Sequence, residues 1–191
     1  MLGLLSVEGL RSAVEIESAY VALVAAQVFF LVLLWPRFER RAVTGPPLES
    51  LAGAAARLAG LVLLSVPLIF VALRTSEAGP ATVLRSQALI VFIGIIAGAA
   101  VRLPGAAVWY YPAAFLVSAV VPLVAYLLLE EGGLSTRWAE SISPFWAAGA
   151  AAAGARRVAP LIVFAGVAVA ALGVALWAGL RGARAAHPDQ A

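Results

Sequence analysis

Five long runs of apolar residues, separated by short polar segments rich in arginine, form the main pattern of this sequence. As an α-helix, a run of about 20 apolar residues crosses the ~30 Å hydrocarbon layer of a bilayer. The runs predict spans at about residues 19–35, 58–73, 86–101, 104–129 and 158–180. The expected fold is therefore all-α, a polytopic membrane helix bundle.

Composition favours a membrane protein over a soluble helical domain. Hydrophobic residues make up 63% of the 191 residues, and charged residues make up only 12%. A soluble domain of this size has too much surface for its volume to hide so many apolar side chains. The surplus of arginine over acidic residues borders the apolar runs, so it indicates membrane orientation and not nucleic-acid binding.

Two segments are too short or too polar to cross a membrane. Residues 1–18 contain Glu8 and are expected to form an interfacial segment on the membrane surface. Residues 143–155 begin with Ser143 as N-cap and Pro144 at the first helical position. This stretch is shorter than a span, so it predicts a short re-entrant or interfacial helix on the outer side.

The first two runs contain residues that mark membrane boundaries. Pro36 follows Trp35 and is expected to stop the first helix. Arg57 lies within the second run, and its side chain is expected to extend back toward the headgroups. Residues 58–73 are then the apolar part of that span.

The arginines predict an orientation. Arg37, Arg40 and Arg41 lie close together after the first span and form the densest basic cluster next to a span. Because cytoplasmic loops are enriched in arginine, the cluster predicts an N-terminus outside, five crossings and a cytoplasmic tail at residues 181–191. The chain has no lysine and much alanine, a composition typical of a GC-rich bacterial genome and hence of a bacterial inner membrane.

Composition also excludes several kinds of chemistry. The chain has no cysteine, and its one histidine, His187, lies in the polar tail. It therefore cannot supply disulfides, thiolate metal sites, iron–sulfur clusters or the ligands of a transmembrane haem. It has no GxxxxGK[ST] loop to bind phosphate, so the chain itself is not expected to hydrolyse ATP. No catalytic residue, cofactor or metal is predicted.

Two positions inside the spans are candidates for a transport pathway. Gln27 is an amide deep in the first span, where it would either contact a substrate or hydrogen-bond to another helix. Pro67 lies in the second span and bends the helix there. Such bends serve as hinges in transporters, and they also occur in static membrane proteins. Gly94 and Gly98 form a GxxxG pattern, which permits close helix approach.

A charged segment after the first span is a candidate for binding a partner. Arg37, Glu39, Arg40 and Arg41 are expected to form a compact cytoplasmic turn that would dock a soluble protein. The orientation rule alone also explains these arginines. All acidic residues are expected in loops, and none inside a span.

Three short motifs occur in order along the chain. The first is Ala26-Gln27, in a helix that closes with Pro36 and is followed by a charged loop. The second is Ser65-Val66-Pro67. The third is Ser143-Pro144-Phe145-Trp146, followed by small residues and a final helix with a basic end. In these features the chain resembles the membrane subunits of ABC-2 type exporters. Members of that family have six spans and a short outer element before the last helix. The family's first helix and its Glu-Arg-x-x-Gly-Thr-like loop stretch are missing here.

The resemblance implies a homo- or hetero-oligomeric permease that works with a separate soluble ATPase bound at residues 37–41. Transport would follow alternating access. The main alternative is a non-catalytic accessory subunit that scaffolds a larger membrane complex, for example a respiratory one. A small secondary transporter or channel is a third interpretation, and the sequence offers it neither inverted repeats nor charges inside the spans. An associated ATPase would favour the first interpretation, and associated redox subunits the second.

Overall fold

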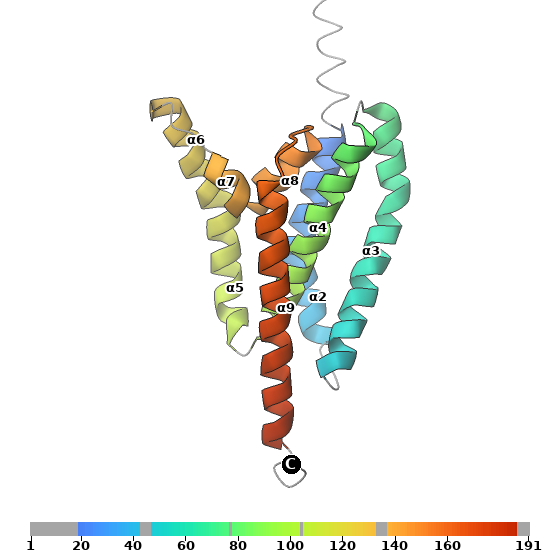
Figure 1. The fold of residues 1–191 in the computed structure, drawn as a ribbon, viewed down its shortest axis with the longest axis vertical. Helices are drawn as coiled ribbons and strands as arrows, with labels where there is room; N and C mark the ends of the chain where they lie inside the picture. The colour runs from blue at the N-terminus through green and yellow to red at the C-terminus, as the bar shows by residue number, and fades with distance from the viewer. Residues whose placement is uncertain (1–18, 43–46, 77, 104, 133–136, 187–191) are drawn as a thin grey trace, which may run out of the picture.

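The chain folds as a bundle of helices (Figure 1). The computed structural model describes residues 19–42, 47–76, 78–103, 105–132 and 137–186. Within these residues, five helices are long and apolar enough to cross a membrane: Ala19–Ala42, Glu49–Arg74, Pro80–Ala100, Val108–Leu128 and Ala159–Arg181. The predictions of an all-α fold and of a multi-span bundle are confirmed.

The five spans differ in how they are built. The first consists of an α-helical stretch at residues 19–29, the π-helix η1 (Phe30–Leu34) and α2 (Trp35–Ala42). The second and third are α3 (Pro47–Thr75) and α4 (Pro80–Ala100). The fourth consists of α5 (Ala106–Phe115), the π-helix η2 (Leu116–Val120) and α6 (Val121–Gly132). Two short helices, α7 (Arg137–Ile142) and α8 (Pro144–Ala152), precede the last span, α9 (Ala159–Ala186).

Consecutive spans run in opposite directions, so the first span begins at one end of the bundle and α9 finishes at the other (Figure 1). We call the end where the first span begins the N-side and the end where α9 finishes the C-side. α2 and the start of α3 lie at the C-side, whereas α7 and α8 lie at the N-side. α8 begins as the sequence predicts: Ser143 Oγ accepts a hydrogen bond from the Trp146 amide at 3.4 Å, and Pro144 follows the cap.

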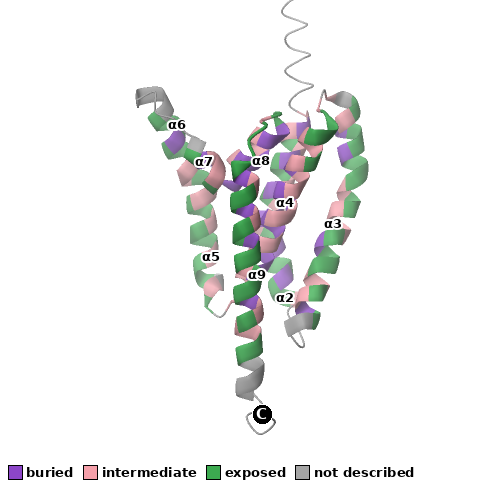
Figure 2. Ribbon diagram, viewed as in Figure 1, coloured by how far each residue is buried: buried purple, intermediate pink, exposed green. Residues whose placement is uncertain are grey.

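The core lies around α4, which contacts the first span, α3, α8 and α9 (Figure 2). Two glycines of α4 permit this packing. A Cβ atom on Gly94 would lie 2.7 Å from Leu58 Cδ1, and one on Gly98 would lie 3.2 Å from Trp35 Nε1. The GxxxG pattern therefore brings α3 and the first span close to the backbone of α4.

Two spans, α3 and the fourth, consist mostly of residues that are not buried (Figure 2). In their most apolar stretches, only 11% of α3 and 6% of the fourth span are buried, against 44% of α4. Leu64 on α3 and Trp109 on α5 are both 74% exposed. Surfaces of this kind face hydrocarbon, so the chain is a multi-pass membrane protein in contact with the bilayer.

Three boundaries differ from the sequence prediction. The first helix does not stop at Pro36 but continues to Ala42. α3 begins at Pro47, because the predicted residues 58–73 marked only its apolar part and the helix starts in the interfacial region. α7 forms between the predicted fourth span and the predicted short helix at 143–155, where no helix was predicted.

The continuation past Pro36 has a local cause that the fourth span shares. In both spans one residue separates the π-helix from a proline: the Trp35 amide donates to Phe30 O before Pro36, and the Val121 amide donates to Leu116 O before Pro122. Proline lacks an N–H and its ring crowds the preceding turn. A wider π turn accommodates the ring without ending the helix.

Candidate functional site

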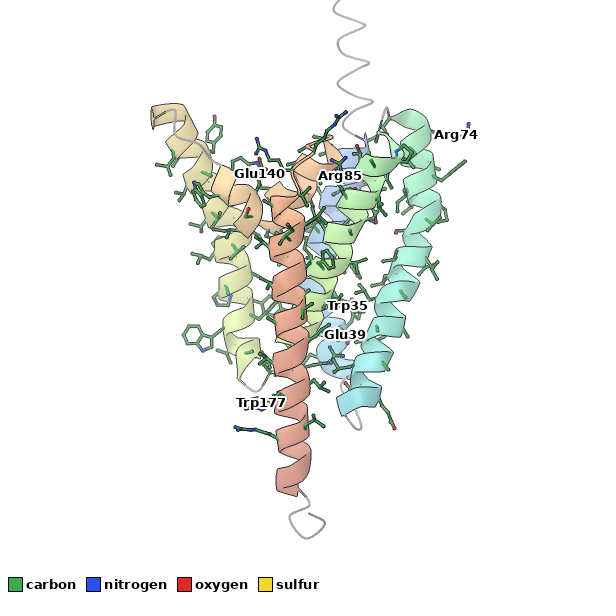
Figure 3. All side chains as sticks on the ribbon, in the orientation of Figure 1. Trp35, Glu39, Arg74, Arg85, Glu140 and Trp177 are labelled. Atoms are coloured by element: carbon green, nitrogen blue, oxygen red, sulfur yellow. The ribbon has the colours of Figure 1, made fainter. Side chains whose placement is uncertain are left out.

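A buried ion cluster joins three parts of the bundle near the C-side (Figure 3). Glu39 on α2 has a fully buried side chain. Arg57 of α3 forms a bidentate pair with it, donating from Nε to Oε1 at 2.7 Å and from Nη2 to Oε2 at 2.9 Å. Arg102, just after α4, donates from Nη2 to the same Oε2. One carboxylate is therefore shared by two guanidinium groups, and the cluster carries a net positive charge.

Arg102 is the more buried of the two arginines. Its side chain is 7% exposed, whereas that of Arg57 is 40% exposed. Arg102 Nη1 donates to Gly98 O at 2.5 Å, and Nη2 also approaches Ser50 O at 3.3 Å. A buried charge is costly unless it is paired and hydrogen-bonded. Glu39 and Arg102 therefore depend on each other to remain buried.

The cluster corrects one expectation from the sequence and adds a partner to another. No acidic residue was expected inside a span, yet Glu39 lies within Ala19–Ala42 and faces α3 and α4. Arg57 does extend back along α3, with its guanidinium near Gly53, and there it pairs with Glu39. The physical reason is that η1 carries the helix past Pro36, so Glu39 is on a helix and not in a turn. Its partners are 18 and 63 residues away, so no local pattern reveals them.

The four residues predicted to bind a partner divide into two groups. Arg37, Arg40 and Arg41 are exposed on α2, and we call them the basic surface of α2. Glu39 is turned inward, and its carboxylate bonds within the chain. Glu39 thus fixes the helix that presents the three arginines.

The two pathway candidates lie in different surroundings. Gln27 is half-buried and accepts a hydrogen bond from Gln87 Nε2 of α4 at 3.1 Å. Nearby in sequence, Tyr20 Oη and Ser86 Oγ are 2.6 Å apart, so polar contacts join the first span to α4 at more than one level. Pro67 is exposed on α3 and is not brought near Gln27 by these contacts. The contacts of Gln27 are those of helix packing.

A large cavity lies on the other side of α4. It has a volume of about 490 Å³ and is bounded by α4, the fourth span, α7, α8 and α9, with Val32 of η1 reaching it from the first span. Its lining is apolar apart from Tyr110, Ser118 and Ser141. Tyr110 Oη donates to Val32 O at 2.8 Å, the carbonyl that Pro36 leaves without its usual helical donor. Sequence reasoning missed this cavity, because its walls come from distant parts of the chain.

A smaller cavity of about 130 Å³ lies beside the ion cluster. Trp35, Gly98, Arg102 and Leu172 are among the residues that line it. Trp35 Nε1 and Arg102 Nε are buried without a hydrogen-bond partner among the described residues. Among all the residues that the structure describes, no three His, Asp or Glu side chains lie close enough together to bind a metal ion.

The fold and the exposed apolar faces define a multi-pass helical membrane protein. Compared with known proteins, the chain matches no protein-family model, no curated protein and no solved structure. The arrangement of the ion cluster and of the cavity is therefore the basis for a functional proposal.

Proposed function

We propose that this chain is the membrane-spanning subunit of an export complex and that it works with a separate ATPase. The observation that carries the proposal is the basic surface of α2, which Glu39 joins to Arg57 of α3 and to Arg102 after α4. A soluble protein bound to Arg37, Arg40 and Arg41 would act on a helix end that is bonded to two other spans. A flexible loop would not pass on such a displacement.

The ion cluster offers a route for coupling. A shift of α2 is transmitted to Arg57 and Arg102, because separating the pairs would leave charges buried without partners. α4 packs in turn against α8 and α9, which border the cavity of about 490 Å³. An ATPase that binds two arrangements of α2 with different affinity would thereby shift the arrangement of the cavity. The resemblance to ABC-2 type exporters supports the same division of labour.

We further propose that the C-side faces the cytoplasm of a bacterial inner membrane and that the N-terminus lies outside. The support is the density of exposed arginine at the C-side end of α2. The chain has no cysteine, so single cysteines report orientation directly. Arg40→Cys is expected to react with a membrane-impermeant maleimide only after spheroplasts are permeabilised. Arg156→Cys, exposed near the N-side, is expected to react in intact spheroplasts. The reverse pattern would contradict the proposed orientation.

The partner is tested by purifying the tagged chain in mild detergent and identifying co-purifying proteins by mass spectrometry. A soluble ATPase in stoichiometric amount is expected. Changing Arg37, Arg40 and Arg41 together to Gln is expected to weaken its binding about tenfold, since exposed ion pairs contribute ~0.2–1 kcal/mol each. The measurement is the amount of ATPase retained at increasing salt.

The matched control removes the same charge elsewhere. Arg74 is exposed at the N-side (Figure 3), and Arg156 and Arg157 are exposed between α8 and α9. The joint change of these three arginines to Gln is expected to leave ATPase retention unchanged. Equal loss in both triple variants would show a nonspecific charge effect. Purification without any ATPase would sink the export proposal.

A second candidate function is an accessory subunit that scaffolds a larger membrane complex. The observation that favours it is the broad apolar exposure of α3 and the fourth span, where Leu63 is 70% exposed and Phe115 is 65% exposed. Faces of this kind can pack against other membrane chains. Co-purification with cofactor-bearing membrane subunits and no ATPase would select this function over export.

A further inference from the structure

The cavity of about 490 Å³ is lined by neutral side chains. Its volume falls within the ~300–1,000 Å³ typical of sites that enclose a small ligand. None of its lining residues is Asp, Glu, Arg or His. A charged or strongly polar ligand would lose its hydration there without compensation. The lining therefore selects an apolar ligand.

The lining of the cavity extends along the bundle axis, the direction in which the hydrocarbon chains of a bilayer lie. Its lining residues on α4 run from Ile93 to Ala100. At the α-helical rise this interval covers about 10 Å along the helix axis. The α7–α8 segment contributes Ser141 and Pro144 at the N-side end. The lining thus follows the bundle axis from the level of α7 toward the C-side end of α4.

Both π-helices contribute to this cavity. Val32 of η1 and Val117 and Ser118 of η2 belong to its lining, and they approach it from different spans. π turns widen a helix and occur frequently at functional sites. Tyr110 donates its hydroxyl hydrogen to Val32 O, so that hydrogen is not available to a ligand. The backbone irregularities of the bundle therefore converge on one apolar space.

The cavity is open on the side that faces lipid. Three of its lining residues, Ile142, Val163 and Val167, are also 41–47% exposed at the surface of α7 and α9. At its N-side end the lining includes the hydroxyl of Ser141 on α7, whereas the ion pair of Glu140 and Arg157 belongs to a separate small pocket. An amphiphile with its head at that end would place its tail between α4, η2 and α9.

We propose that this cavity binds one hydrocarbon chain of a membrane amphiphile, which enters sideways from the N-side half of the bilayer. Its headgroup lies beside α7, near Ser141. Burial of apolar surface against closely fitting walls distinguishes this chain from bulk lipid. Binding does not depend on an ATPase, so the inference stands apart from the proposed export function.

The test uses the full chain in nanodiscs of phosphatidylcholine that contain a small fraction of the same lipid with a diazirine in its acyl chain. After irradiation, peptide mass spectrometry compares adducts on cavity residues such as Val117 and Phe164 with adducts on the outward face of α3, at Leu63 and Leu64. The cavity is expected to accumulate more adducts per exposed side chain than the face of α3. Equal labelling of the two sites would overturn the proposal.

Two variants fill the cavity from opposite walls. Ala114→Phe on α5 and Val167→Trp on α9 both place a ring at lining positions. Each is expected to reduce the cavity adducts to the level of the α3 face. Ala119→Phe and Val169→Trp make the same changes at exposed positions outside the lining, and they are expected to retain the cavity adducts. Unchanged cavity labelling in both filled variants, each monodisperse by size exclusion, would also overturn the proposal.

Discussion

Glu39→Gln is expected to destabilise the bundle by about 3–5 kcal/mol, the usual cost of removing one partner from a buried ion pair. The variant keeps the shape of the side chain and removes the charge that Arg57 and Arg102 share. Arg102, whose side chain is only 7% exposed, would then be buried without a carboxylate. The measurement is the midpoint of thermal unfolding of the purified chain in detergent, followed by circular dichroism.

The matched control is Glu49→Gln, which makes the same chemical change in the exposed first turn of α3. A carboxylate at the start of a helix contributes only ~0.3–1 kcal/mol through the helix dipole. The Glu39 variant should therefore unfold at a distinctly lower temperature than the Glu49 variant. If the two variants unfold together, Glu39 is not what holds α2 to the bundle.

Gly98→Leu is expected to have the second largest effect. A Cβ atom on Gly98 would already lie 3.2 Å from Trp35 Nε1 and 3.6 Å from Arg102 Nη1. The rest of the leucine side chain would displace both residues and disturb the ion cluster. Overpacking of a close contact costs about 1–3 kcal/mol, and more where charged groups lose their partners. The same unfolding measurement reports the loss.

Gly166→Leu is the control for this substitution. Gly166 is exposed on α9, and a Cβ atom there has no atom within 4 Å. Leucine also favours the helix by about 0.5–1 kcal/mol relative to glycine. Gly166→Leu should be neutral or slightly stabilising, so the two variants are expected to differ in sign. Equal behaviour would mean that the close approach at Gly98 does not matter.

The features predicted correctly from the sequence are those with local causes. Hydrophobic run length locates the five spans, because the bilayer sets the length of an apolar helix. Ser143 followed by Pro144 predicts the start of α8, because an N-cap and a first-turn proline act within one turn. The spacing of Gly94 and Gly98 indicates a close helix contact, and the structure names its partners as Leu58 and Trp35.

The features that the sequence did not reveal depend on residues that are far apart. The sequence places Glu39 in a basic turn, because Pro36 is expected to end the helix before it. Only when the helix continues past Pro36 does its carboxylate face the guanidinium groups of Arg57 and Arg102. One lone acid among three arginines beside a span was the available signal. That pattern alone does not identify Arg57 and Arg102 as the partners of Glu39. The large cavity lies between elements from distant parts of the chain. No pattern within any one of these elements predicts the space between them.

The π-helix η1 sets the direction in which the end of the first span points. A π turn inserts one extra residue into the helix, so everything after it is rotated by about 100° relative to an uninterrupted α-helix. Without that extra residue, the inward position would fall to Phe38, which is now 56% exposed, and Glu39 would turn away from its two arginines. Pro36 therefore does more than bend a helix. Because η1 rotates α2 about its axis, Glu39 and not Phe38 packs into the bundle. The same rotation leaves Arg37, Arg40 and Arg41 facing outward.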